Sequence, residues 1–315
     1  MRPAAVLLGR PRARSLDWGA MSGDTNGGAE LAGFDALMPG PTGRPLRDFP
    51  EPKPLKNHGP ARIIALCNQK GGVGKTTTTI SLGAALAEYG RKVLAIDFDP
   101  QGALSAGLGV PSHDVPTVYD LLLGRETDAR KAVQATATPN LYIIPANIDL
   151  SAAEVHLVNE VAREQILARV LKPLVDDYDV ILIDCQPSLG LLTVNALTAA
   201  HGVLIPLECE YFALRGVALL VETIDKVRDR LNPAVQLDGI LATMYDARTL
   251  HSREVLERVV EVFGEKVLET VIGRTVKFPD ASVAGAPITT FAPDHPAAGA
   301  YRQLARELIA RGQVA

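Results

Sequence analysis

The sequence contains few cysteines, a single tryptophan and no excess of basic charge. Its three cysteines, Cys67, Cys185 and Cys209, are too few and too widely spaced for a disulfide framework or a CxxC metal site. Isolated cysteines of this kind are typical of a reducing compartment, so we expect a cytoplasmic protein. Acidic residues (36) outnumber basic ones (32), and the net charge of −4 excludes a strongly basic nucleic-acid binder, though not a local basic patch.

Long apolar runs are also missing. No apolar stretch approaches 18 residues, so we expect no membrane-spanning helix. The apolar segment at residues 4–8 is short and is followed by three arginines, which makes a signal peptide a poor interpretation. The composition, 47% apolar and 22% charged, is that of an ordinary globular protein, and 315 residues are enough for one or two domains.

Residues 1–60 differ in composition from the rest of the chain. They hold 9 of the 22 prolines and 9 of the 27 glycines, and such a segment cannot bury enough apolar area to offset chain entropy. We therefore expect a mostly disordered N-terminal extension. Two interpretations stay open: a passive extension, or an arm that binds a partner or an acidic surface through Arg10, Arg12, Arg14, Leu16 and Trp18.

From residue 61 onward, apolar runs alternate with helical patterns, which predicts one domain over residues 61–315. Five runs have the pattern of strands buried on both faces: 63–67, 93–96, 179–184, 202–206 and 239–243. Helices are expected between and after them, for example at 76–89, 154–171 and 252–263. This order predicts an α/β fold, a doubly wound, mostly parallel sheet of the P-loop NTPase type with helices on both faces.

Ligands bind such sheets at the carboxyl ends of the strands. The turns that follow Cys67, Ile96, Ile183 and Ile205 should therefore lie close together.

The glycine-rich segment after the first expected strand is the strongest motif. It reads Gly71-Gly72-Val73-Gly74-Lys75-Thr76, and its backbone N–H groups would form an anion-binding nest at the start of a helix. Lys75 would reach the β- and γ-phosphates of a nucleotide, and Thr76 would place its hydroxyl on Mg²⁺. The usual G-x-x-x-x-G-K-[ST] pattern has glycine where this chain has Gln69, and Lys70 follows one residue later.

Two acidic turns complete the predicted site. Asp184 ends an apolar strand and suits a Walker B role, holding Mg²⁺ through water. Asp97 and Asp99 follow the second strand and, being two residues apart, point to the same side while the strand persists, so both could face the phosphates. We assign Asp99 as the residue that orients the attacking water and as a further metal-site candidate.

These residues together resemble the deviant Walker A ATPases of the ParA/MinD/Soj family. The resemblance rests on residues 70–77, on the switch-like segment 97–102 and on the Walker B-like segment 184–190, and it extends from about residue 63 to 308. The partitioning branch, ParA/Soj, fits best because residues 99–102 and 244–249 look like the corresponding segments of that branch.

The resemblance implies a weak, Mg²⁺-dependent ATPase that forms a homodimer with ATP and is accelerated by a ParB-like or other partner protein. Lys70 of each subunit would contact the phosphates bound by the other subunit. Together with Lys75 and Asp99, whose roles are given above, Lys70 is a catalytic candidate. The residues implied at the nucleotide are Lys70, Gly71, Gly72, Val73, Gly74, Lys75, Thr76, Thr77, Met244, Gly273 and Thr275, and those at the metal are Thr76, Asp99 and Asp184.

The chain departs from the family pattern at two places. Gln186 replaces the first of two prolines that usually follow the Walker B aspartate. The Ile-Pro-Arg-Asn segment near the adenine is here Ile272-Gly273-Arg274-Thr275, in which Gly273 and Thr275 keep backbone groups for the base. ATP remains the expected nucleotide.

Partner binding is less well marked in the sequence. The positions that match the family's non-specific DNA contacts are Arg248 and Lys277, with Arg274 nearby, but residues 240–280 hold six basic and seven acidic side chains. The apolar stripe of the C-terminal helix, from Tyr301 to Ile309, is expected to pack on the sheet rather than to bind a membrane. Two functions stay open: a DNA-partitioning ATPase switch, or a nucleotide-gated adaptor that regulates another complex without significant DNA binding.

Overall fold

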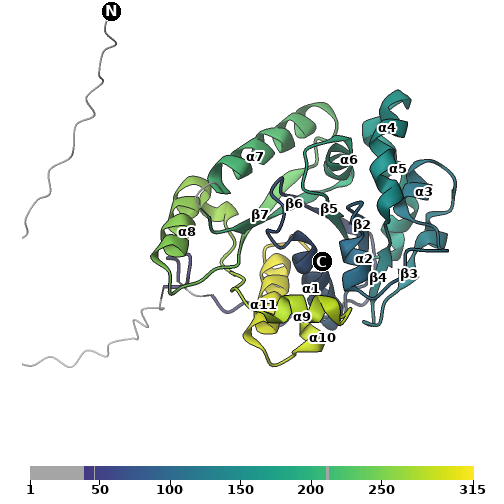
Figure 1. Cartoon of the computed structure of the whole chain (residues 1–315). Coiled ribbons are helices and arrows are strands. Elements are labelled where there is room, and N and C mark those ends of the chain that lie inside the picture. Colours follow the sequence, from purple (N-terminus) through teal and green to yellow (C-terminus); the bar gives the residue numbers. More distant parts are fainter. Residues whose placement is uncertain (1–38, 46, 211–212) are drawn as a thin grey trace, which may run out of the picture. The chain divides into compact units, whose positions relative to one another are not determined.

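The computed structural model describes residues 39–45, 47–210 and 213–315 (Figure 1). These residues belong to one compact unit, Met38–Ala315. Our expectations for residues 1–38, including the docking arm of Arg10, Arg12, Arg14, Leu16 and Trp18, concern a part of the chain outside the described residues.

Seven strands of the described chain form one sheet in the order β3-β4-β2-β5-β1-β6-β7. Neighbouring strands are parallel except for β3, which pairs antiparallel with β4 at one edge. The doubly wound α/β fold is therefore confirmed. The strands are β1 (Arg62–Leu66), β2 (Val93–Phe98), β3 (Gln134–Ala135), β4 (Leu141–Ile144), β5 (Val180–Cys185), β6 (Gly202–Glu208) and β7 (Gln236–Thr243).

Helices cover both faces of this sheet, and each face has its own apolar core. In β1, Ile64 and Leu66 pack on one side while Ile63 and Ala65 pack on the other, as the pleat of a strand requires. The first side is covered by α1 (Lys75–Glu88), α2 (Ala103–Gly107), α9 (Lys277–Val283), α10 (Ile288–Phe291) and α11 (Pro296–Ala310). The second is covered by α3 (Val118–Leu122), α5 (Ile166–Leu171), α6 (Leu191–Ala199), α7 (Ala213–Arg230) and α8 (Leu250–Phe263).

The C-terminal helix packs where the sequence predicted. Tyr301, Leu304 and Leu308 of α11 are buried, and the Tyr301 hydroxyl lies 3.1 Å from the hydroxyl of Thr78 on α1. None of the helices in the described ranges is both long and apolar enough to cross a bilayer. All three cysteines are buried with free thiols, as expected.

The single helix expected over 154–171 is wrong. The segment forms α4 (Ala153–His156), two short 3₁₀ turns and then α5. Glu160 has an extended backbone and Ala162 a left-handed one (φ 53°), and neither conformation continues a helix. The sequence analysis also missed β3, which has only two residues, and β4, whose four-residue apolar run is as long as the predicted run 93–96.

The compact unit begins earlier than the expected boundary at residue 60. Side chains of the domain hold this segment through its backbone: Arg91 donates to the carbonyl of Lys53 (2.9 Å), and the N–H of Gly59 donates to Asp179 (2.9 Å). Arg44 in turn donates to the carbonyl of Val267 (2.6 Å). Hydrogen bonds to the domain and the burial of Phe49 thus tie this segment to the compact unit, which an argument from composition does not detect.

Candidate nucleotide site

The loops that carry the predicted motifs meet at the carboxyl ends of the central strands. The Asn68 side chain donates to the carbonyl of Pro206 in β6 (2.8 Å), and the Thr243 hydroxyl at the end of β7 donates to the carbonyl of Val73 (2.9 Å). The N–H of Gln186, after β5, donates to the carbonyl of Phe98 in β2 (3.3 Å). The expectation that these turns lie close together is confirmed.

The glycine-rich loop leads directly into the first turn of α1. Gly72 (φ 75°) and Gly74 (φ 85°) have left-handed backbones that other residues rarely adopt. A Cβ added to either exposed glycine, Gly71 or Gly72, would meet no atom within 4 Å, and both glycines line a pocket beside the loop. The N-terminus of α1 has no side-chain cap, and its N–H groups face this space as donors for an anion.

Lys75 lies inside the loop. It is buried, and its Nζ donates to the carbonyl of Lys70 over 3.2 Å. Burial lowers the pKa of Lys75, while the nearby charge of Asp184 opposes the shift only in part. A buried ammonium beside an anion nest is suited to bind phosphate, because the negative charge of the phosphate would compensate the ammonium for its lost hydration.

Thr76 and Asp184 form the oxygen donors of the site. The Thr76 hydroxyl donates to Asp184 (2.6 Å), and Asp184 pairs in register with Asp97 on the neighbouring strand. Burial, followed by the charge of Asp97, raises the pKa of Asp184 to about 8. Burial likewise raises the pKa of Asp97 to about 6, although hydrogen bonds from Ser105 oppose the shift.

This donor set fits a magnesium ion. The buried carboxylate of Asp184 and the hydroxyl of Thr76 are hard oxygen ligands of the kind that Mg²⁺ prefers. No group of three or more His, Cys, Asp or Glu side chains that could hold a metal occurs in the described residues. A Mg²⁺ bound here would therefore use Thr76, Asp184, water and phosphate oxygens.

Asp97 and Asp99 have different surroundings, although they are two residues apart. Asp97 lies within β2, is fully buried and accepts hydrogen bonds from the N–H (2.9 Å) and hydroxyl (2.7 Å) of Ser105. Asp99 lies beyond the end of β2 and lines a pocket with the loop glycines, Thr76, Thr77 and Pro187. The expectation that both face the phosphates is therefore wrong for Asp97, which the strand directs into the core.

An apolar pocket adjoins the phosphate loop. Its volume is about 280 Å³, and the predicted residues Met244, Gly273 and Thr275 all line it. The strip 272–275 is held beside β7 by the N–H of Tyr245, which donates to the carbonyl of Ile272 (3.0 Å). Sequence analysis missed the pocket's other apolar lining residues, Phe278 and Pro279, which no motif marks.

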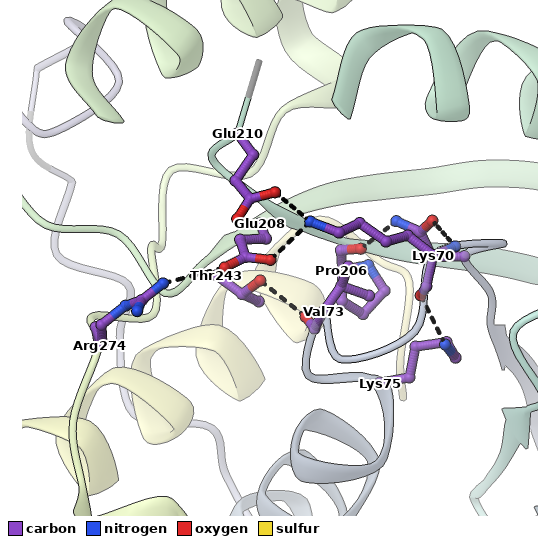
Figure 2. A network of polar contacts seen from close by, with 9 residues as sticks. Lys70, Val73, Lys75, Pro206, Glu208, Glu210, Thr243 and Arg274 are labelled. Atoms are coloured by element: carbon purple, nitrogen blue, oxygen red, sulfur yellow. Dashed lines mark hydrogen bonds and ion pairs between the residues drawn. The ribbon is translucent and has the colours of Figure 1, made fainter. Parts of the chain in front are cut away.

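Lys70 points away from the loop toward the end of β6. Its Nζ makes ion pairs with Glu208 (2.9 Å) and Glu210, and Glu208 also accepts from Arg274 (3.0 Å), as Figure 2 shows. The sequence analysis missed both glutamates. The available signal was their place at the carboxyl end of an apolar strand, where ligands bind such sheets.

The three candidate DNA contacts each pair with a carboxylate. Arg248 is 89% exposed and binds Asp246 (2.8 Å), Lys277 lies 3.5 Å from Asp280, and Arg274 binds Glu208. Arg274 and Lys277 lie within one short segment of the chain, and the N–H of Arg274 donates to the carbonyl of Tyr245 (3.2 Å), three residues before Arg248.

Comparison with known proteins agrees with this geometry. A family model described as an AAA domain matches residues 61–237, more than half of the chain. The chromosome-partitioning ATPase Soj of Treponema pallidum is 49% identical over 250 residues, which cover 79% of this chain and 98% of that protein. The chain belongs to the ParA/Soj family of P-loop ATPases. An uncharacterised Mycobacterium tuberculosis protein is 62% identical over 273 residues, 86% of each chain.

A solved member of similar fold carries a nucleotide. The crystal structure of a Mycobacterium smegmatis protein described as cobyrinic acid a,c-diamide synthase, with bound ADP and magnesium, has a TM-score of 0.71 and 43% identity. The match covers 80% of this chain and 96% of that one. The similarity supports a nucleotide with Mg²⁺ as the ligand of ParA/Soj-type sites of this shape.

Proposed function

We propose that this chain is an ATP-dependent dimerising switch that acts in chromosome or plasmid partitioning. The observation that carries the proposal is the position of Lys70: it precedes the phosphate loop, is 45% exposed, and directs its ammonium to Glu208 and Glu210 instead of its own anion nest. An exposed ammonium at the rim can neutralise phosphates held by a second copy, which would otherwise repel the first.

Each group of site residues has its own role in the proposed reaction. Gly71 to Gly74 and the start of α1 bind the phosphates, while Lys75 neutralises them from inside the loop. Asp99, beside that space, orients the attacking water. A Mg²⁺ held by Thr76 and Asp184 would supply charge neutralisation for the leaving phosphate oxygens.

The apolar pocket would hold the base. Met244 and Phe278 offer apolar surface to a planar ring, and the backbone of Gly273 and Thr275 offers hydrogen-bonding groups. These groups suit an adenine, so ATP is the proposed nucleotide. Loss of the γ-phosphate after hydrolysis would remove the charge that joins the two subunits, and a ParB-like partner would set the timing.

Non-specific DNA binding by the ATP dimer is part of this proposal. Arg248, Arg274 and Lys277 would contact DNA phosphates, and the dimer would double their number. The pairing of each with a carboxylate favours the second candidate, an adaptor that controls another protein complex without significant DNA affinity. A salt titration of DNA binding in the presence of a non-hydrolysable ATP analogue separates the two.

The decisive experiment compares wild type with Lys70→Ala. Mass is measured by light scattering with Mg²⁺ and a non-hydrolysable ATP analogue, and nucleotide affinity by calorimetry. We expect Lys70→Ala to bind nucleotide but to stay monomeric, whereas Lys226→Ala, which removes an exposed ion pair on α7, dimerises like wild type. A wild type that ignores nucleotide in both measurements, or a Lys70→Ala variant that dimerises normally, refutes the proposal.

A further inference from the structure

The end of β6 presents two carboxylates to one lysine. Glu208 is the last residue of β6 and Glu210 lies two residues beyond it; both contact Lys70, while Cys209 between them is buried. Glu208 is the more enclosed partner, with its side chain 12% exposed against 53% for Glu210. Figure 2 shows the Lys70 ammonium held between them.

The charges in this cluster balance. Glu208 and Glu210 carry two negative charges, and Lys70 and Arg274 carry two positive ones. Burial alone would lower the pKa of Lys70, but its hydrogen bonds to Glu210 and Glu208 outweigh burial and raise the pKa. When Lys70 leaves, Arg274 alone faces two carboxylates, so departure of the lysine has an electrostatic cost.

We propose that Glu208 and Glu210 form an autoinhibitory latch, which holds Lys70 on its own subunit until a second subunit presents a bound triphosphate. This inference rests on the proposed role of Lys70 across the dimer. One ammonium cannot contact the latch carboxylates and the partner's phosphates together, so the two compete for it. Triphosphate carries more charge than either carboxylate, and therefore only a nucleotide-loaded partner draws the lysine away.

The latch explains how dimerisation can depend on the nucleotide. Without Glu208 and Glu210, Lys70 would be free to engage any anionic surface. With them, each subunit must break its own ion pairs before it joins the other. Exposed ion pairs contribute little individually, so the latch sets a threshold and does not block the dimer.

The first test needs no dimer. Wild-type monomer without nucleotide is treated briefly with an N-hydroxysuccinimide acetate, and acetylation at Lys70 is quantified by mass spectrometry. Because only the neutral amine reacts, we expect Glu208→Gln with Glu210→Gln to accelerate acetylation of Lys70 about threefold or more. Glu126→Gln, which removes an exposed carboxylate paired with Lys131, should leave the rate unchanged.

Arg274→Gln gives a result of opposite sign. It leaves Glu208 entirely to Lys70, so acetylation of Lys70 should slow, whereas general loosening of the region would accelerate it. Equal rates in wild type and the double glutamine variant, or acceleration in Arg274→Gln, would overturn the latch.

The second test measures its consequence. With a non-hydrolysable ATP analogue, the double glutamine variant should dimerise with a Kd about fivefold lower than that of wild type, because exposed ion pairs contribute little individually. If the wild type forms the nucleotide dimer and requires Lys70, but the variant's Kd and acetylation rate do not change, the latch fails while the proposed function stands. If neither the wild type nor the variant dimerises, the proposed function fails, and the acetylation rates still decide whether Lys70 is held.

Discussion

The hydroxyl of Thr76 donates to the carboxylate of Asp184 over 2.6 Å, and this contact joins the first turn of α1 to the end of β5. Asp184 is fully buried beside a second buried carboxylate, Asp97. Without a cation, two such groups disfavour each other's ionised form. The protein has thus placed negative charge where the core tolerates it poorly, which is typical of a cation site rather than of a structural contact.

This arrangement predicts an unusual dependence of stability on pH. The pKa of Asp184 is about 8 in the folded protein, above its value of about 4 in an unfolded chain, so the folded state binds the extra proton between these values. The free energy of unfolding should therefore fall as pH rises from about 4 to about 8, and Asp97 adds to the fall up to about pH 6.

Asp184→Asn tests that prediction by urea unfolding without nucleotide or magnesium. Asparagine keeps an acceptor for Thr76 and removes the charge, so the variant should be more stable than wild type by about 2 kcal/mol at pH 8.5, with the difference shrinking toward pH 5. Asp225→Asn, at an exposed ion pair, serves as the matched control. Parallel pH profiles for wild type and Asp184→Asn would contradict the assignment.

The sequence predicts the fold well where the physics is local and strong. Continuous apolar runs identify β1, β2, β5, β6 and β7 because a strand buried on both faces has apolar side chains at most of its positions. The edge strand β3 lacks that signal because it has only two residues, whereas β4, which lies between β3 and β2, is a four-residue apolar run that the sequence analysis did not use. The irregular segment after α4 was not predicted because Ala162 has a left-handed backbone, which alanine rarely adopts.

In the site, too, some residues could be predicted from local sequence and others could not. The phosphate loop and the Thr76–Asp184 pair follow from a motif whose residues must be adjacent or at strand ends. The latch glutamates and the apolar wall at Phe278 come from segments that only the folded sheet brings to the loop. The separate surroundings of Asp97 and Asp99 depend on one residue, since β2 ends at Phe98.

Lys75→Ala should remove nucleotide binding. Its buried ammonium lies inside the loop, 3.2 Å from the carbonyl of Lys70. A charged hydrogen bond to phosphate contributes about 1.5–3 kcal/mol. We expect calorimetry at micromolar protein to detect no binding of Mg–ATP, while the thermal midpoint without nucleotide stays near that of wild type. Lys53→Ala, at an exposed position, controls for general loss of charge. Retention of wild-type affinity would remove Lys75 from the site.

Asp99→Ala should separate binding from hydrolysis. Asp99 lies at the phosphate pocket, and within the described residues its carboxylate accepts a hydrogen bond only from the N–H of Gln101 (3.0 Å), so its removal costs the fold little. We expect unchanged nucleotide affinity, ATP turnover reduced about 100-fold, and a stable dimer with ATP on size-exclusion columns. A variant that elutes as a monomer with ATP, or that turns over at the wild-type rate, would show that another group orients the water.

The basic residues of the candidate DNA surface should affect how DNA affinity depends on salt concentration. Each phosphate contact adds about one unit to the slope of log affinity against log salt, so Arg248→Ala or Lys277→Ala should each reduce the slope of the nucleotide-bound dimer by about one per subunit. The loss in affinity itself should be modest, because each cation must first leave Asp246 or Asp280. Arg258→Ala, at another exposed, ion-paired arginine, on α8, should leave the slope unchanged. Wild-type slopes near zero with the ATP analogue would favour the adaptor, since a partner recognised without phosphate contacts releases no condensed counterions.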